Sequence, residues 1–244
     1  MISVEPIGNV AALRLDRAEK RNALTPTMLA SLRGAIDRAT AADCILLSGV
    51  GEVFCAGFDL KLCQGDPAML PALLRALAEC ITALRDSPCP VVVSAHGAAI
   101  AGGCALLAPA DVIVTNAEAR VGYPVVLLGI SPAVNTPFLR SLIGDGPTRT
   151  RSLDPGLVSG THALRIGLAH ECVPTVAECE PRALELATQL ALKPRYALRA
   201  TRAWLRTLAP LDHATDALHA SLSLCGSPEE TGLLAALWNK ETTK

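Results

Sequence analysis

Two short stretches of the chain combine a tight turn with backbone N–H groups that the turn leaves unpaired. In VFCAGFDL (53–60) an apolar run reaches Gly57, which permits a turn that frees the N–H of Phe58. In HGAAIAGGCALL (96–107) paired glycines from Gly102 open a short apolar helix, whose first N–H groups and positive dipole end face whatever lies before the helix. Two such donors are what stabilise a thioester oxygen that becomes an enolate or a tetrahedral oxyanion.

The elements that must position these turns alternate along the chain. Strands dominate the first half and helical patterns the second, which predicts an α/β fold with a helical C-terminal region. Thr25 and Pro26 mark the start of the first helix as its N-cap and first position. The predicted strands are 10–15, 44–49, 90–97 and 111–116, and the predicted helices are 27–40, 67–86, 102–109, 132–143, 161–166, 178–192, 195–208 and an interrupted 212–239. The Pro/Gly-broken segment 147–160 is compatible with a lid or a plain connection.

Composition narrows the class of protein. The chain has 244 residues, half of them apolar, and a net charge of −1, which argues against nucleic acid as a partner. Nine cysteines without a C-x-x-C pair fit a reducing compartment. The N-terminus lacks the order of a signal peptide, and polar residues, glycines and a proline break the most apolar region. We therefore expect a cytoplasmic protein without a membrane span or a metal site.

One basic stripe follows helical spacing. Arg195, Arg199, Arg202 and Arg206 lie on one face of KPRYALRATRAWLR. Charged helix faces are usually solvated, so we expect this stripe to face water, with an anionic ligand or a partner subunit as the alternative.

In order along the chain, these stretches resemble the crotonase superfamily, which contains the enoyl-CoA hydratases and isomerases. The resemblance covers nearly the whole chain. It rests on RAEKRNALTPTML, VFCAGFDLK, SAHGAAIAGGCALLAPADVIVTNAEARVGYPVVLLGISPA, HALRIGLAHECV and SPEETGLLAALWNK. It implies a spiral core of ββα turns over residues 1–190 and a helical trimerisation region over 191–244. It also implies a homotrimer or a dimer of trimers, and an acyl-CoA substrate that brings the only coenzyme.

The resemblance also implies roles for individual residues. The N–H groups of Phe58 and Gly102 would form the oxyanion hole. Tyr123 is a separate candidate from its place two residues before Val125: its phenol could donate a proton to an enolate, or it could be a wall residue with a satisfied hydroxyl. The residues implied in substrate binding are Ala23, Leu24, Ala56, Asp59, Leu60, Lys61, Val125 and Lys240. Of these, Lys61 and Lys240 are equally compatible with ordinary surface lysines.

Both glutamates that the resemblance leads one to expect are absent. The first would stand at Ala105 and the second at Val125. Hydration needs a base to activate water, and moving a double bond needs a group that shuttles the proton. Decarboxylation of a malonyl-type thioester needs only a stabilised enolate and a later proton. Backbone donors survive any side-chain change, so thioester binding and polarisation should remain.

Other polar residues near these segments are weaker candidates. We expect Asp59 to make a structural contact, His96 to be structural and Cys104 to be an inert buried thiol. Ser131, Asn135 and Thr136 border the expected site and could hold a water, whereas Glu118 or Asp59 could supply a carboxylate by turning inward. His213 and His219 are expected at the surface or at an interface.

Three functions remain open. The first is an acyl-CoA enzyme of the enoyl-CoA hydratase/isomerase type with relocated catalytic groups, and it is the one most simply described by the pattern. The second is chemistry that needs no glutamate, such as decarboxylation or thioester hydrolysis. The third is a non-catalytic acyl-CoA-binding subunit.

Overall fold

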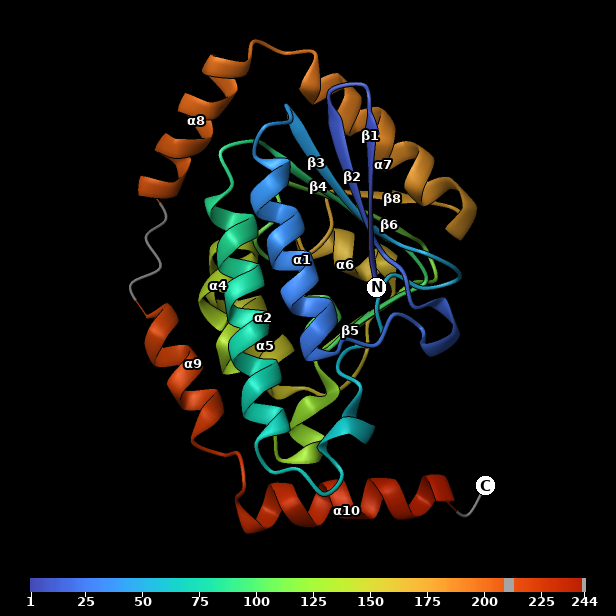
Figure 1. Ribbon diagram of the computed structural model, residues 1–244, viewed down its shortest axis with the longest axis vertical. Helices are drawn as coiled ribbons and strands as arrows, with labels where there is room; N and C mark the ends of the chain where they lie inside the picture. Colours follow the sequence, from blue (N-terminus) through green and yellow to red (C-terminus); the bar gives the residue numbers. More distant parts are fainter. Residues whose placement is uncertain (209–212, 243–244) are drawn as a thin grey trace.

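A six-stranded sheet forms the centre of the computed structural model, which describes residues 1–208 and 213–242 (Figure 1). The strand order is β1-β2-β3-β4-β6-β8; β1 and β2 pair antiparallel, and the other neighbours pair in parallel. A second, parallel sheet pairs β5 with β7. The strands are β1 (Ile2–Ile7), β2 (Val10–Leu15), β3 (Cys44–Gly49), β4 (Val91–Ala95), β5 (Ala98–Ile100), β6 (Val112–Asn116), β7 (Arg120–Gly122) and β8 (Glu171–Val173).

Helices cover both faces of the large sheet and continue into a C-terminal arm. They are α1 (Pro26–Ala39), α2 (Met69–Asp86), α3 (Gly102–Ala105), α4 (Thr136–Ile143), α5 (Asp145–Leu153), α6 (Gly160–Arg165), α7 (Val176–Ala191), α8 (Arg195–Leu208), α9 (Ala214–Leu222) and α10 (Pro228–Thr242). Four 3₁₀ turns join them: η1 (Ala18–Lys20), η2 (Leu60–Cys63), η3 (Pro124–Leu128) and η4 (Pro132–Asn135). As predicted, α1 begins with Pro26 after an N-cap, Thr25, whose side chain accepts a hydrogen bond from the Met28 N–H (3.1 Å). No helix in the described part of the chain is long and apolar enough to cross a membrane.

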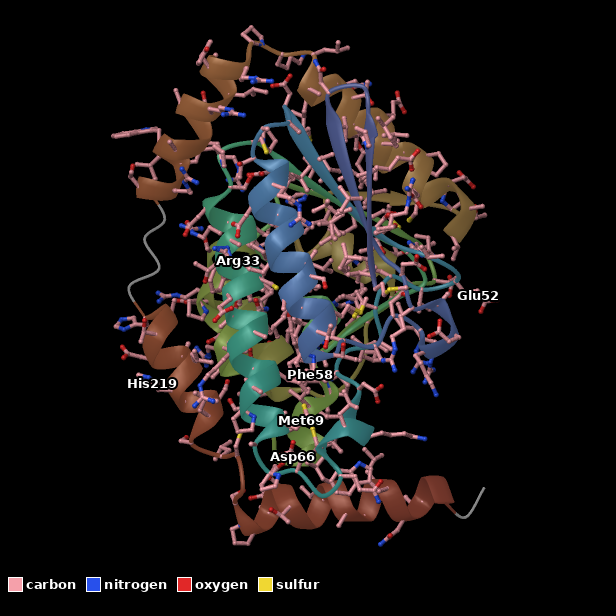
Figure 2. All side chains as sticks on the ribbon, viewed as in Figure 1. Arg33, Glu52, Phe58, Asp66, Met69 and His219 are labelled. Atoms are coloured by element: carbon pink, nitrogen blue, oxygen red, sulfur yellow. The ribbon has the colours of Figure 1, made fainter. Side chains whose placement is uncertain are left out.

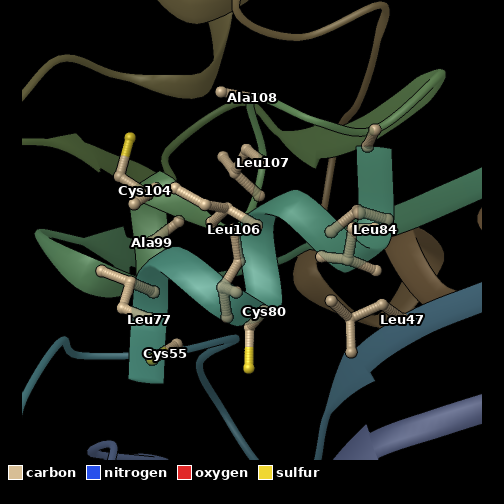
Figure 3. Close-up of a cluster of buried hydrophobic side chains, with 14 of the residues drawn as sticks. Leu47, Cys55, Leu77, Cys80, Leu84, Ala99, Cys104, Leu106, Leu107 and Ala108 are labelled. Atoms are coloured by element: carbon tan, nitrogen blue, oxygen red, sulfur yellow. The ribbon is translucent and has the colours of Figure 1, made fainter. Parts of the chain in front are cut away.

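Strand β3 shows why the short apolar runs of this chain are strands. All six of its residues are buried. Its side chains alternate between two clusters, with Ile45 and Leu47 on the side of α1 and α2, and Leu46 on the side of α7. Both faces of the sheet are thus covered, so the strand is apolar throughout instead of alternating. Figure 3 shows Leu47 with Cys80 and Leu84 of α2 in the larger cluster.

The strands absent from our prediction are β1 and three strands of three residues each, β5, β7 and β8. Three residues are too few for a periodic pattern to identify them. Two of these strands nevertheless matter for the candidate site, because β5 leads directly into α3 and β7 leads into η3. Within 147–160 the chain completes α5 before it becomes a connection to α6. The helix α5 is also absent from our prediction, since we expected a lid or a plain connection from residue 147.

The arginine stripe on α8 faces the protein, so the prediction of a solvated face is wrong. Arg202 is buried, pairs with Asp111 (Nε to Oδ2, 2.8 Å) and donates to the carbonyl oxygens of Leu84 (3.0 Å) and Arg85 (2.9 Å). Arg206 donates to the carbonyl of Asp86 (2.6 Å). The last carbonyls of a helix have no partner within it, and α2 presents them to these guanidinium groups.

Candidate active site

A cavity of about 140 Å³ brings together the two turns singled out in the sequence. Its wall is formed by positions within 56–60, by two leucines of α2, and by positions within 100–105 and 123–135. Most of these side chains are apolar. The polar side chains among the described lining residues are Tyr123, Ser131 and Asn135. The space is therefore suited to an apolar chain with polar contacts at a few points.

The backbone around Phe58 is fixed by a bridge to Leu24. The Leu24 N–H donates to the Gly57 carbonyl (2.7 Å), and the Asp59 N–H donates to the Leu24 carbonyl (2.9 Å). Because these bonds use the groups on either side of Phe58, its own N–H points away from Leu24. It donates to no residue that the structure describes. Phe58 itself lies beside the start of α1 (Figure 2).

The second donor segment touches the first. A Cβ placed on Gly102 would lie 3.1 Å from the Phe58 ring, and one placed on Gly57 would lie 3.8 Å from the Gly102 nitrogen. Gly102 is the first residue of α3, and within the described chain its N–H also has no hydrogen-bond partner. Helix α3 has only four residues, so it supplies unpaired N–H groups and little of the macrodipole that we expected.

Ala101, between these segments, has an unusual backbone. Its φ of 52° and ψ of −115° lie in a region that favours glycine. Its N–H donates to the carbonyl of Gly122 (2.8 Å), which ties the start of α3 to the end of β7. This conformation turns the chain sharply from β5 into α3, and it stores strain next to the unpaired Gly102 N–H.

Asn22 is a supporting residue that the sequence analysis missed. It is fully buried, accepts a hydrogen bond from the Arg17 N–H (2.8 Å) and donates to the carbonyls of Val50 and Val53 (both 2.9 Å). It thereby joins the segment that carries Leu24 to the segment that leads to Phe58. Its φ of 55° is one that asparagine tolerates better than most residues, but no spacing in the sequence announces it.

Tyr123 is the one titratable group among the described residues that line the cavity. Its side chain is buried; the hydroxyl donates to the Cys104 carbonyl (3.3 Å) and accepts from Asn135 Nδ2 (2.7 Å). Burial raises the pKa of Tyr123 well above its ordinary value, and the hydrogen bond from Asn135 opposes that shift. The phenol is therefore neutral at ordinary pH, able to give a proton but not to take one.

The turn η4 that carries Asn135 is anchored from α9. Ser221, which is buried, accepts a hydrogen bond from the Val134 N–H (2.8 Å) and donates to the carbonyl of Ser131 (3.0 Å). No sequence signal pointed to Ser221, because it lies in a different helix far along the chain. Asn135 is 1% exposed, and its Oδ1 has no partner among the described residues.

The remaining predicted residues divide into two groups. Ala56, Leu60, Val125 and Ala105 line the cavity with Phe58, Gly102 and Tyr123. The others, which surround the cavity or lie on the surface, are Ala23, Leu24, Asp59, Lys61, Cys104, Glu118, Thr136, Lys240, His96, His213 and His219.

Several of these have clear structural contacts. Asp59 pairs with Arg17 (2.8 Å), as expected of a structural carboxylate, and Arg17 also donates to the carbonyl of Ala23 (3.0 Å). Glu118 is exposed and does not line the cavity. Cys104 is buried, and burial raises the pKa of its thiol to about 12.

The predicted histidines lie outside the cavity. His96 is buried, and its Nε2 lies 3.1 Å from the Gly51 carbonyl. His213 and His219 are exposed, and Figure 2 places His219 on α9, away from Phe58. Lys61 on η2 and Lys240 on α10 are exposed as well.

Comparison with known proteins gives a consistent picture. A family model described as "Enoyl-CoA hydratase/isomerase" matches residues 5–232. The chain is 31% identical over 219 residues to a putative enoyl-CoA hydratase of Thermus thermophilus, covering 85% of this chain and 84% of the relative. It is 28% identical over 208 residues to a crotonyl-CoA hydratase of Syntrophomonas wolfei, covering 83% and 80%.

The fold comparison agrees. A crystal structure of an enoyl-CoA hydratase/isomerase from Xanthobacter autotrophicus Py2 superimposes with a TM-score of 0.88 at 24% identity, covering 98% of this chain and 93% of that one. The predicted crotonase-type α/β fold is therefore confirmed. Trimerisation through the C-terminal region stays a prediction.

Proposed function

Because the chain belongs to the enoyl-CoA hydratase/isomerase family, we propose that it binds a coenzyme A thioester with the acyl chain in the apolar cavity. The thioester oxygen would accept hydrogen bonds from the N–H groups of Phe58 and Gly102. The coenzyme would run past Ala23, Leu24 and the segment from Asp59 to Lys61. Lys240 of a neighbouring copy in a trimer would approach its phosphates.

One observation carries this proposal: two backbone N–H groups from separate segments meet at one cavity without a described partner. Buried backbone donors are nearly always satisfied, so an unpaired pair beside a cavity suggests a ligand oxygen. Each such donor contributes about 10²–10³ in rate when charge develops on the oxygen it faces.

The reaction that fits best generates an enolate without a base. Ala105 and Val125 line the cavity at the positions where the family resemblance leads one to expect glutamates. Tyr123 stays protonated, so it is a poor base for activating water or for removing an α-proton. These features argue against hydration and in favour of decarboxylation of a malonyl-type thioester.

In that reaction the bond between the α-carbon and the carboxylate breaks and carbon dioxide leaves. Its electron pair passes into the thioester enolate, whose oxygen the two N–H groups stabilise. Tyr123 then gives its proton to the α-carbon, and the phenolate is reprotonated by water. Tyr123 reaches the substrate by turning its O–H away from the Cys104 carbonyl. The hydrogen bond that it gives up is long, with 3.3 Å between the two oxygens.

A second candidate is acyl-CoA binding without turnover. It is favoured by the same Tyr123 hydroxyl, which has partners on both sides, Cys104 and Asn135, and so is already satisfied within the protein. A protein that only bound the thioester would use the cavity and the backbone donors but leave this hydroxyl in place.

The experiment that separates these functions is mass spectrometry of acyl-CoA mixtures incubated with the protein in D₂O. The mixtures pair 2-enoyl-, 3-enoyl- and malonyl-type thioesters. We expect loss of carbon dioxide from the malonyl type, with one deuterium in the product. Conversion of the enoyl pair instead would contradict the base-free reaction, and binding without any conversion would support the second candidate.

A further inference from the structure

The hydroxyl of Tyr123 has a second partner that the proposed reaction does not yet use. Asn135 Nδ2 donates to the Tyr123 oxygen over 2.7 Å, the shorter of the two hydrogen bonds at that oxygen. The direction of these bonds follows from simple counting. A phenol has one proton, and the Cys104 carbonyl can only accept it, so the amide of Asn135 must donate.

Only one end of the Asn135 amide has a hydrogen-bond partner among the described residues. Its Oδ1 is buried and unpartnered within the described chain, while its Nδ2 faces Tyr123. An unpaired buried acceptor is unfavourable for folding, and an apolar side chain of similar size would avoid it. Stability of the fold therefore does not explain an amide at this position. The hydrogen bond to Tyr123 is the one described interaction that the Asn135 side chain makes.

The surroundings hold this amide in place. Asn135 ends the turn η4, and Ser221 of α9 fixes that turn through the N–H of Val134 and the carbonyl of Ser131. Tyr123 comes from a different segment, directly after β7. The contact between the Asn135 N–H and the phenol oxygen thus depends on two separate elements, η4 and the segment after β7.

We propose that Asn135 is a positioning residue for Tyr123: its amide holds the phenol oxygen and stabilises the charge that develops there when the proton leaves. This inference rests on the proposed role of Tyr123 as the acid. As the O–H bond breaks and a C–H bond forms at the α-carbon, the negative charge moves to the phenol oxygen. The Asn135 N–H then becomes a hydrogen bond to an anion, which is stronger than one to a neutral phenol. Water later returns the proton, and the amide is unchanged.

A double-mutant cycle with malonyl-CoA and methylmalonyl-CoA as probes tests this role. We expect Asn135→Leu, which keeps the branching at Cγ but not the donor, to lower kcat about 10- to 100-fold with KM within a factor of about three. In a Tyr123→Phe background the same substitution should have no further effect on the residual rate. Equal losses in both backgrounds would overturn the proposal, because a purely structural residue acts regardless of Tyr123.

Two further variants remove alternative explanations. Asn135→Asp places an acceptor where the donor was, so it should lose activity as Asn135→Leu does; full activity of the Asp variant would overturn the proposal. Thermal unfolding of each variant identifies any that fail to fold. If wild type turns over no malonyl-type thioester, the proposed function fails and this inference falls with it, whereas turnover with an additive cycle rejects the inference alone.

A spectroscopic measurement reports the contact directly. The chain has two tyrosines, and Tyr196 is 86% exposed on α8, so Tyr196→Phe leaves Tyr123 as the only tyrosine without touching the cavity. With tyrosine labelled by ¹³C at Cζ, that variant gives a single resonance that responds to hydrogen bonding at the phenol oxygen. Asn135→Leu should shift this resonance, and an unchanged position would overturn the proposal.

Discussion

The cavity wall has two parts that are built in different ways. At Phe58 and Gly102 the proposed donors are backbone N–H groups. Hydrogen bonds between main-chain atoms of 24, 57 and 59 orient the first, and the bond from Ala101 to Gly122 holds the segment of the second. At Tyr123 and Asn135 the groups are side chains that meet from separate elements. A change of side chain cannot delete a backbone donor, whereas one substitution removes the phenol or the amide. In the proposed function, the first part cannot be deleted by a change of its own side chains, and the second determines which reaction can follow binding.

The largest effect should come from the side-chain part. Tyr123→Phe removes the proposed acid and little volume, so we expect turnover of the malonyl-type thioester to fall by about 10²–10⁴. Thioester binding should be unchanged, because the backbone donors and the apolar wall remain. Steady-state kinetics and calorimetric titration with a non-reactive acyl-CoA analogue measure the two quantities. Unchanged turnover would remove Tyr123 from the mechanism.

The pH profile sharpens this prediction. The active form of Tyr123 is the neutral phenol, and its raised pKa keeps that form populated throughout the neutral range. The rate should therefore be flat from about pH 6 to about pH 9, where the acid keeps one protonation state. A loss of rate between about pH 5 and pH 4 in a protein that stays folded would indicate a carboxylate instead.

The backbone part can be disturbed only through its geometry. Gly57 has a φ of 96°, and a Cβ there would lie 3.0 Å from the Ile100 carbonyl oxygen and 3.1 Å from Ala101. Gly57→Ala should displace the Phe58 N–H and lower kcat by about 10²–10³, the value of one oxyanion donor. The measurement is the rate with the same thioester.

Gly8→Ala is the matched control for this variant. Gly8 also has a positive φ, of 57°, but a Cβ there would meet nothing within 4 Å. Gly8→Ala should lose about 1 kcal/mol of stability, through the left-handed conformation alone. Activity should stay at the wild-type level. If both variants lost activity equally, the loss would reflect stability and not the position of the donor.

His96 supports the segment that leads to Phe58, and its protonation should have a smaller effect, on the stability of the protein. Its carbonyl accepts the Phe54 N–H (2.8 Å), and burial lowers the pKa of its side chain. Below pH 6.5, the ordinary value, the unfolded chain takes up a proton that the folded protein resists, so stability falls as the pH falls. We expect wild type to lose more stability than His96→Gln between pH 7 and pH 5, by urea unfolding. Parallel curves for the two proteins would contradict this expectation.

The smallest effect concerns the strained residue between the two donors. Ala101→Gly relieves a φ of 52° but adds freedom to the unfolded chain, so the stability should change by less than about 1 kcal/mol. Turnover should fall no more than about threefold if hydrogen bonds alone hold Gly102. A larger loss of rate at unchanged stability would show that the strain itself keeps the Gly102 N–H in position.

The backbone part was predictable from the sequence and the side-chain part only partly so. The turns at Gly57-Phe58 and at Gly102 could be predicted from the local sequence, since a turn depends on residues next to each other. Tyr123 was a candidate by position, and Asn135 was considered as a holder of water. Their contact was not foreseen, because it depends on how η4 is fastened to α9 through Ser221.

Dependence on contacts between distant segments also explains errors in the predicted fold. The long apolar strands and α1 were predicted correctly from periodicity and capping. The three-residue strands have no pattern to detect, and β5 and β7 form only because they find each other. The arginine stripe was misassigned because its partners, the last carbonyls of α2, are polar backbone groups that no sequence pattern displays.

That stripe has a consequence for how the chain is made. The carbonyls of Leu84 and Arg85 accept hydrogen bonds from the guanidinium of Arg202, which lies 118 and 117 residues further along the chain. A nascent chain that has emerged only to residue 190 contains every strand of the sheet and almost all of α7. The last carbonyls of α2 can then form hydrogen bonds only with water, because α8 has not yet been made. Domains fold from the N-terminus during synthesis. The C-terminal end of α2 is thus completed only after Arg202 has left the ribosome, and it is among the last parts of the core to become native.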